Sequence, residues 1–180
     1  MALNFIPKLT PHLSPVFLLV LSVTVFLAPV EQSGSEKEFE MKYYIMEIQS
    51  GPNATVVPGT GIAGKLWSPT NWGTILVCHN PFVEDPSPYS RKVGQVRGLE
   101  VASSKDGEYN YICSSTMFTR SEYNGSTLQA QGTFNRASRG ASVLSIVGGT
   151  GTFKGARGIA MLQTYSASFL LFIIKFSLPK

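Results

Sequence analysis

From Met41 onward the chain is a series of short runs rich in Val, Ile, Tyr, Thr and Phe, separated by clusters of Gly, Pro, Asn and Asp. Such runs are typical of β-strands, and the clusters are typical of the turns between them. After the N-terminal leader, no segment keeps a 3.6-residue apolar period over three helical turns. The sequence therefore predicts an all-β fold.

The expected strands can be placed by these runs. They are 41–49, 60–66, 73–79, 92–103, 109–118, 125–133, 142–148, 156–166 and 169–177. Asp106-Gly107 separates two of them and is the strongest short hairpin signal that a sequence offers. Several strands are apolar on both faces, as in Ile159–Leu162. Such a sheet either packs on a second layer or closes into a barrel whose outer face meets another subunit.

The segment Gly148–Gly158, GGTGTFKGARG, has the glycine content of a phosphate-binding loop but not its spacing. Lys154 does not follow a glycine, and the third glycine of the dinucleotide motif is missing. We therefore expect a tight turn at Gly148–Gly151, between a strand that ends at Val147 and one that starts near Ala156. Glycine would supply the positive φ angles there.

The N-terminus has the pattern of a secretory signal peptide. Lys8 and His12 precede an apolar run at Val16–Leu27, whose twelve residues are fewer than a membrane-spanning helix needs. The pattern favours a cleaved signal at 1–30 over an uncleaved anchor. Residues 31–40 are charged and poor in apolar side chains, so we expect a flexible lead-in before one domain at 41–180.

Composition argues against several kinds of site. The net charge of +4 comes without a run of Lys or Arg, which argues against nucleic-acid binding. His79 is the only histidine after the leader, and two cysteines are too few for a zinc site. Cys78 is adjacent to His79 and faces the opposite side of a strand, so the two cannot act as a pair. Cys78 and Cys113 either form a disulfide or remain buried thiols.

Glu47 lies inside an otherwise aromatic and aliphatic run. A buried carboxylate has to be hydrogen-bonded, so Glu47 is either an edge residue facing water or an acid in a pocket. The pattern alone favours the edge. The remaining acids fall next to Pro or Gly or at strand ends, where solvated turn residues are expected. These acids are Glu84, Asp85, Glu100, Asp106, Glu108 and Glu122.

Two N-glycosylation sequons lie in turn-like sequence, at Asn53-Ala54-Thr55 and Asn124-Gly125-Ser126. Behind a secretory signal they would be usable, so both asparagines are predicted to lie on surface loops as glycosylation sites.

Several stretches resemble, in the same order, motifs of the dirigent family of plant secreted proteins. They are YYIMEIQSGPNAT (43–55), WGTILVCHNP (72–81) with KVGQVRGLEVASSKDG (92–107), FTRSEYNGSTLQAQG (118–132) and IVGGTGTFKGARGIAMLQTY (146–165). The last two are hard to obtain from generic strand composition. On these motifs the chain is identified as a member of the family.

The resemblance implies an eight-stranded antiparallel up-and-down β-barrel, usually a homotrimer, in the apoplast or cell wall. Family members bind phenoxy radicals or quinone methides derived from monolignols and direct stereoselective coupling in lignan and phenylpropanoid biosynthesis. A separate laccase or peroxidase makes the radicals, so no cofactor or metal is expected in the chain. The physical basis is orientation of two reactants in one pose. Some relatives also protonate a quinone methide, which is general acid catalysis.

The resemblance also implies site residues. The family's first-strand His-Asp occurs here as Met46-Glu47, which makes Glu47 the pocket acid. The family's second acid falls near Asn135, which has no carboxylate. The pocket arginine aligns ambiguously, at Ser142 by strict counting with Arg136 and Arg139 nearby, and Arg139 is assigned to the catalytic site.

Other family positions are matched directly or altered. Thr164 and Arg157 match and are expected to bind substrate, although Arg157 could equally brace the turn. The family's Asp-Asp before a proline is replaced by His79-Asn80. The C-terminal block Phe169–Ile174 is either a closing strand or an exposed edge.

The leading expectation is a secreted protein that steers radical coupling without oxidising anything. The alternative is a noncatalytic barrel that binds phenolics or assembles in the wall. A lyase or isomerase acting on a quinone methide would need two acids and is disfavoured by Asn135, so whether the chain is an enzyme stays open.

Overall fold

The computed structural model describes residues 36–179 except 62 and 65–67, and within these ranges the regular structure is almost entirely β-strand. The strands are β1 (Lys37–Met46), β2 (Val56–Thr60), β3 (Ile75–Val83), β4 (Lys92–Ala102), β5 (Tyr109–Phe118), β6 (Thr127–Asn135), β7 (Ser142–Thr150), β8 (Arg157–Ser166) and β9 (Phe169–Leu178). Two single-turn 3₁₀ helices, η1 (Ser121–Tyr123) and η2 (Gly151–Phe153), complete the set. Within the described part, neither helix could cross a bilayer. The predicted signal peptide at 1–30 lies outside the described residues.

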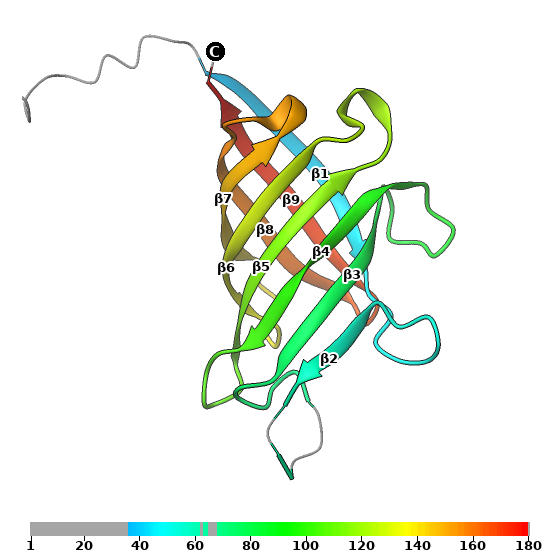
Figure 1. Ribbon diagram of the computed structural model, residues 1–180, viewed down its shortest axis with the longest axis vertical. Helices are drawn as coiled ribbons and strands as arrows, with labels where there is room; N and C mark the ends of the chain where they lie inside the picture. Colours follow the sequence, from blue (N-terminus) through cyan, green and yellow to red (C-terminus); the bar gives the residue numbers. More distant parts are fainter. Residues whose placement is uncertain (1–35, 62, 65–67, 180) are drawn as a thin grey trace, which may run out of the picture. The chain divides into compact units, whose positions relative to one another are not determined.

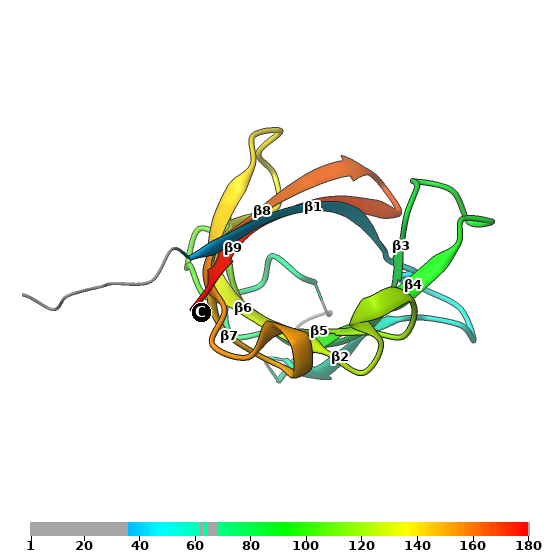
Figure 2. The same ribbon diagram turned by 90° about the horizontal axis from the view of Figure 1, so that it is seen from above.

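The strands form a closed antiparallel barrel, as Figures 1 and 2 show. Eight strands follow each other round the ring in the order β1, β9, β8, β7, β6, β5, β4, β3, and β1 pairs with β3 to close it. β2 pairs with the first half of β3, whereas β1 pairs with its end. The two short pairings therefore share one side of β3. The prediction of an eight-stranded antiparallel barrel is confirmed.

The first strand begins earlier than predicted. β1 starts at Lys37 and pairs with β9 along its whole length, from Lys37 opposite Leu178 to Met46 opposite Phe169. The expectation of a flexible lead-in through residue 40 is therefore wrong for 37–40. Charged residues alternate there with Phe39, whose ring stacks on Phe176 at 4.9 Å, so the segment is a half-buried strand despite its charge.

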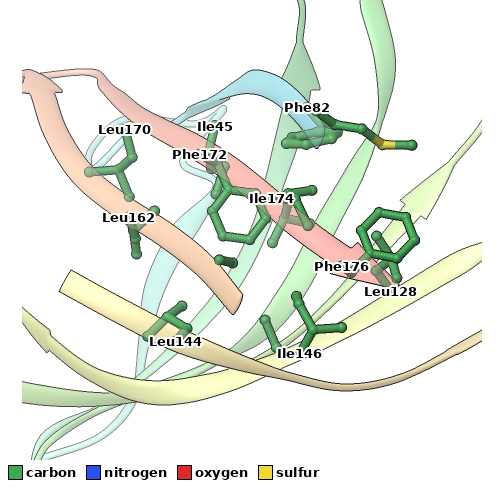
Figure 3. Close-up of a cluster of buried hydrophobic side chains, with 14 of the residues drawn as sticks. Ile45, Phe82, Leu128, Leu144, Ile146, Leu162, Leu170, Phe172, Ile174 and Phe176 are labelled. Atoms are coloured by element: carbon green, nitrogen blue, oxygen red, sulfur yellow. The ribbon is translucent and has the colours of Figure 1, made fainter. Parts of the chain in front are cut away.

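The apolar C-terminus is the closing strand. β9 lies between β1 and β8 and pairs with both of them. Its inward side chains fill the barrel interior, as Figure 3 shows for Leu170, Phe172, Ile174 and Phe176. The alternative of an exposed edge is excluded because both sides of β9 are hydrogen-bonded.

The glycine-rich segment forms a turn, but a later one than predicted. β7 continues to Thr150, and the chain reverses over η2 and the two residues after it. The positive φ angles fall at Gly151 (61°) and Gly155 (82°). Gly149 stays in the strand, where a Cβ would lie 2.3 Å from the Phe153 carbonyl oxygen. Glycine is needed there because backbones approach closely, not because of its φ angle.

Aromatic side chains fill one end of the barrel. Phe153 from η2 and Tyr123 from η1 pack on each other with ring centroids 5.0 Å apart. Both contact Phe118, and Phe153 also meets Phe176 edge-on at 5.4 Å. We call these four residues the aromatic plug. Because it closes one end, any site for a guest has to open at the other.

Candidate functional site

The half of the barrel away from the aromatic plug contains an inner cavity. Its volume is about 40 Å³, measured as the space open to the centre of a water-sized molecule. Its lining comes from seven of the strands and the residue that follows β1. The lining residues are Ile45, Glu47, Cys78, Asn80, Val96, Gly98, Leu99, Glu100, Ile112, Ser114, Leu144, Leu162, Leu170 and Phe172.

An outer groove of about 710 Å³ adjoins this cavity. It is lined by Met46–Ser50, Pro88 and the turn between β8 and β9, at Ala167–Phe169. Glu47 lines both spaces. Its carboxylate therefore stands where the outer groove meets the inner cavity.

Two carboxylates are buried in this half of the barrel. Glu47 follows β1, and its amide donates to the Ser168 carbonyl oxygen at 2.8 Å, so the strand direction continues and the side chain faces inward. Glu100 lies on β4, where it shares the inward face with Val96 and Gly98. The two glutamates are only 5% and 3% exposed. Buried carboxylates at such exposure require partners.

Arg136, just after β6, supplies those partners. Its Nη1 donates to Glu47 Oε2 at 3.1 Å, its Nε donates to Glu100 Oε1 at 3.0 Å, and its Nη2 donates to Glu100 Oε2 at 2.5 Å. Asn110 Nδ2 also donates to Glu100 Oε1, at 2.6 Å. We call Glu47, Glu100 and Arg136 the acid–arginine cluster. With both carboxylates ionised it carries a formal charge of −1.

The cluster keeps its guanidinium charged. Burial disfavours the charged form, but the negative charges of Glu100 and Glu47 and their hydrogen bonds outweigh it, so the pKa of Arg136 is raised. The Arg136 carbonyl oxygen lies 3.5 Å from Thr164 Oγ1 on β8. Gln49 Nε2 lies 3.4 Å from Glu47 Oε2 on the groove side. The cluster thus joins three regions far apart in sequence.

Only some of the residues expected in the site lie at the pocket. Glu47 faces the pocket rather than an open edge, and Thr164 lies beside the backbone of Arg136. Asn135 Oδ1 instead accepts from the amides of Ala137 and Ser138, which makes it a turn residue. Its assignment to the catalytic site is not supported by this position.

The two other arginines named from the resemblance lie outside the cluster. Arg139 is exposed, and its carbonyl oxygen accepts a hydrogen bond from Gln163 Nε2. The arginine that reaches the acids is therefore Arg136, three positions earlier. Arg157 Nη1 donates to the carbonyl oxygens of Val147 and Ala156, so it braces the β7–β8 turn.

Sequence reasoning missed two residues of the site. Glu100 was grouped with the solvated acids although the predicted strand 92–103 contained it, and in the structure its carboxylate lies on the inward face of β4. The alternation of Val96, Gly98 and Glu100 was the available signal. Asn80 shares the inward face of β3 with Cys78 and lines the inner cavity. In the sequence it was noted only as the replacement of a family aspartate, which did not indicate that it belongs to the site.

The sequon asparagines, Asn53 and Asn124, are both exposed and lie in turns. Their surface position agrees with the prediction from sequence, and glycosylation itself stays a prediction.

The two cysteines are free and lie on opposite faces of the barrel wall. Cys78 lines the inner cavity, whereas Cys113 on β5 is exposed. The disulfide alternative is excluded, and the expectation of two buried thiols is right only for Cys78, which is partly buried. Burial, followed by the negative charges of Glu100 and Glu47, raises the pKa of the Cys78 thiol to about 12.

The two thiols should therefore react at different rates. At pH 8 the nucleophilic thiolate is almost absent at Cys78, and its fraction grows only as the pH approaches about 12. We expect iodoacetamide to alkylate Cys113 in the native protein and Cys78 only after unfolding, as read by peptide mass spectrometry. In a Cys113→Ser variant the native protein should stay unlabelled. Equal labelling of both cysteines in the folded protein would contradict the assignment.

Comparison with known proteins agrees with this architecture. The sequence model of the family described as Dirigent-like protein matches residues 39–177. Dirigent protein 1 of Arabidopsis thaliana is 29% identical, over 94% of this chain and 93% of that protein. Dirigent protein 11 of the same plant is 31% identical, over 92% of this chain and 88% of that protein.

A solved structure gives the same result. That of the pterocarpan synthase dirigent protein GePTS1 superposes with a TM-score of 0.73 at 26% identity, covering 82% of this chain and 89% of that one. The family match extends over most of the chain and includes every strand of the barrel. The chain therefore belongs to the dirigent family.

Proposed function

We propose that this protein binds a monolignol-derived phenoxy radical or quinone methide at the acid–arginine cluster and directs the stereochemistry of its coupling. The observation that carries the proposal is the burial of two carboxylates around one guanidinium, where the outer groove meets the inner cavity. Family membership supports it. The radical itself would come from a separate laccase or peroxidase.

The sizes of the two spaces indicate how a guest would lie. The outer groove, at about 710 Å³, is within the range of small-molecule sites, which are about 300–1,000 Å³. The inner cavity admits far less. An aromatic ring would therefore lie in the groove against Glu47, with one small polar end directed into the cavity.

Such a pose would be enough to bias a coupling reaction. Arg136 presents N–H groups to an oxygen that carries radical or quinone character, while the apolar walls favour one face of the ring. A difference of about 1.4 kcal/mol between two poses gives a tenfold preference for one product. Orientation alone can thus account for the activity.

A second candidate is acid-assisted reaction of a quinone methide. The sequence disfavoured it because Asn135 has no carboxylate, but Glu100 supplies a second buried carboxylate 3.0 Å from Arg136 Nε. Similarity to a pterocarpan synthase dirigent protein is consistent with a pocket that does more than orient. In this candidate Glu47, at the groove, would first take up a proton and then donate it to the quinone methide, while Glu100 stays the ionised partner of Arg136.

The homotrimer and the apoplastic location belong to the same proposal. Apolar side chains form a row on the outer wall, because Val57 pairs with Val77 and Val77 with Leu99. All three are exposed. Apolar residues in register on the outside of a barrel are what a subunit interface requires. A noncatalytic phenolic-binding or structural barrel remains the alternative.

The proposal is tested by mixing the purified protein with coniferyl alcohol and a laccase and measuring enantiomeric excess by chiral chromatography. We expect one enantiomer of a coupled product to exceed the other at unchanged total yield. Racemic product at unchanged yield would overturn the steering role for that substrate.

The same assay tests the acid. Glu47→Gln removes the charge at the groove and should lower the enantiomeric excess several-fold, because the guanidinium loses one of its two anchors. Glu38→Gln is the matched control, since Glu38 is exposed at the far end of β1 and should leave the ratio unchanged. An unaltered product ratio in Glu47→Gln would show that this charge has no part in the selection.

A further inference from the structure

Asn80 presents an unpartnered polar atom to the inner cavity. It lies on β3 directly before Pro81, faces inward, and is only 3% exposed. Among the described residues, no donor reaches its buried Oδ1. Asn80 also lines the cavity beside Glu47 and Glu100. An acceptor in this position is free to meet a group that enters from the outer groove.

A buried acceptor without a donor destabilises the folded protein. A guest that donates a hydrogen bond to Asn80 Oδ1 removes the free-energy cost of the unsatisfied acceptor. Guests with a hydrogen-bond donor should therefore bind more tightly than guests without one. The available space of about 40 Å³ corresponds to about three water-sized groups, so a hydroxyl fits and an aromatic ring does not.

The chemistry of the guest decides which hydroxyl this is. In a phenoxy radical or a quinone methide the phenolic oxygen has lost its proton and cannot donate. Only an aliphatic alcohol on the side chain keeps an O–H. A carboxylic acid at that place would be ionised and repelled by the formal charge of −1 on the acid–arginine cluster, and an aldehyde or ether has no proton to give.

We propose that Asn80 is a specificity-determining residue whose Oδ1 accepts a hydrogen bond from the aliphatic hydroxyl of the guest. The pocket then selects neutral aryl alcohols over the corresponding ethers, aldehydes and acids. This inference rests on the proposed function for the identity of the guest, but Asn80 acts on binding and not on the coupling step.

Binding can be measured without any oxidant. The probes are dihydroconiferyl alcohol methylated at its phenolic oxygen, the same compound methylated also at the aliphatic hydroxyl, and dihydroferulic acid methylated at its phenolic oxygen. None has a phenolic O–H, and each is titrated into the purified protein by calorimetry. We expect the ether to bind about tenfold more weakly than the alcohol, which is the loss of one hydrogen bond to a buried acceptor. The acid should bind more weakly still.

Asn80→Leu should act in opposite directions on binding and on stability. The alcohol should bind about tenfold more weakly and no better than the ether, whereas the melting temperature should rise because the orphan amide is gone. A merely structural asparagine would instead lower the melting temperature. His79→Leu, at the adjacent position of β3 where the side chain is exposed on the outer face, is the matched control and should keep the preference for the alcohol.

The outcomes separate this inference from the proposed function. Equal affinity for alcohol and ether, binding of neither, or an unchanged preference in Asn80→Leu would overturn the role of Asn80, even where the laccase assay gives an enantiomeric excess. A tenfold preference that Asn80→Leu abolishes supports it, even where the laccase product is racemic. In that last case the steering role fails and the recognition of the hydroxyl stands.

Discussion

Replacing Arg136 by leucine is expected to lower the free energy of unfolding by about 3–5 kcal/mol, because it leaves two buried carboxylates without their counter-charge. Glu47 and Glu100 are 5% and 3% exposed, so water cannot replace the guanidinium without opening the barrel. Urea denaturation of the purified variant measures the change.

The matched control is Arg139→Leu, which removes the same charge from an exposed side chain three residues away. Its effect should stay within about 0.5 kcal/mol. The triple variant Arg136→Leu, Glu47→Gln, Glu100→Gln should recover part of the loss, since it removes the buried charges together with their partner. An Arg136→Leu protein as stable as the parent would show that the cluster is not held by this ion pairing.

Truncating the aromatic plug should be equally costly. Phe153→Ala is expected to lower the free energy of unfolding by about 3–5 kcal/mol, through lost burial and the void it leaves. Phe153 is fully buried, and its ring contacts Phe118, Tyr123 and Phe176 at centroid distances of 5.2, 5.0 and 5.4 Å. Thermal and urea unfolding both report the loss.

Tyr89→Ala is the control for aromatic truncation. Tyr89 is 96% exposed in the β3–β4 loop, so its removal should change stability by less than about 0.5 kcal/mol. If Phe153→Ala proved as mild as Tyr89→Ala, the plug would not be what closes that end of the barrel.

Arg136→Leu and Phe153→Ala would destabilise opposite ends of the barrel for different physical reasons. The plugged end depends on apolar volume, and the open end depends on a compensated set of buried charges. Because the proposed function places stereoselection at the open end, a mild truncation of the plug should spare the enantiomeric excess at temperatures where the variant stays folded. Both ends thus contribute to stability, whereas the proposed selectivity depends on the open end.

Sequence reasoning described most of the barrel. Alternation of apolar and polar residues is local, so strands such as β4 and β5 were placed almost to the residue. Strand prediction failed where most side chains of a strand are charged. Lys37–Glu40 is strand because Phe39 stacks on Phe176, a residue more than one hundred positions away. The second strand was placed four residues too late, because its partner β3 sets the register.

The candidate site was likewise predicted only in part. Glu47 was singled out by its isolation in an apolar run, but that pattern favoured an edge residue, and only the family motif indicated a pocket acid. Its partners were not, since Arg136 lies 89 residues from Glu47 and 36 from Glu100 in sequence. Local pattern gives the face of a strand to which a side chain points, but not which other side chains face it.

The amino-acid sequence by itself determined that the chain forms β-strands joined by glycine turns, and that it carries the motifs of the dirigent family, because both are written in local order. Only the tertiary structure decided that Glu47, Glu100 and Arg136 meet, that Asn80 is left without a partner, and that β9 closes the ring. Closure of the barrel turns one face of every strand inward at once, and this long-range event brings charges that are distant in sequence together in the interior.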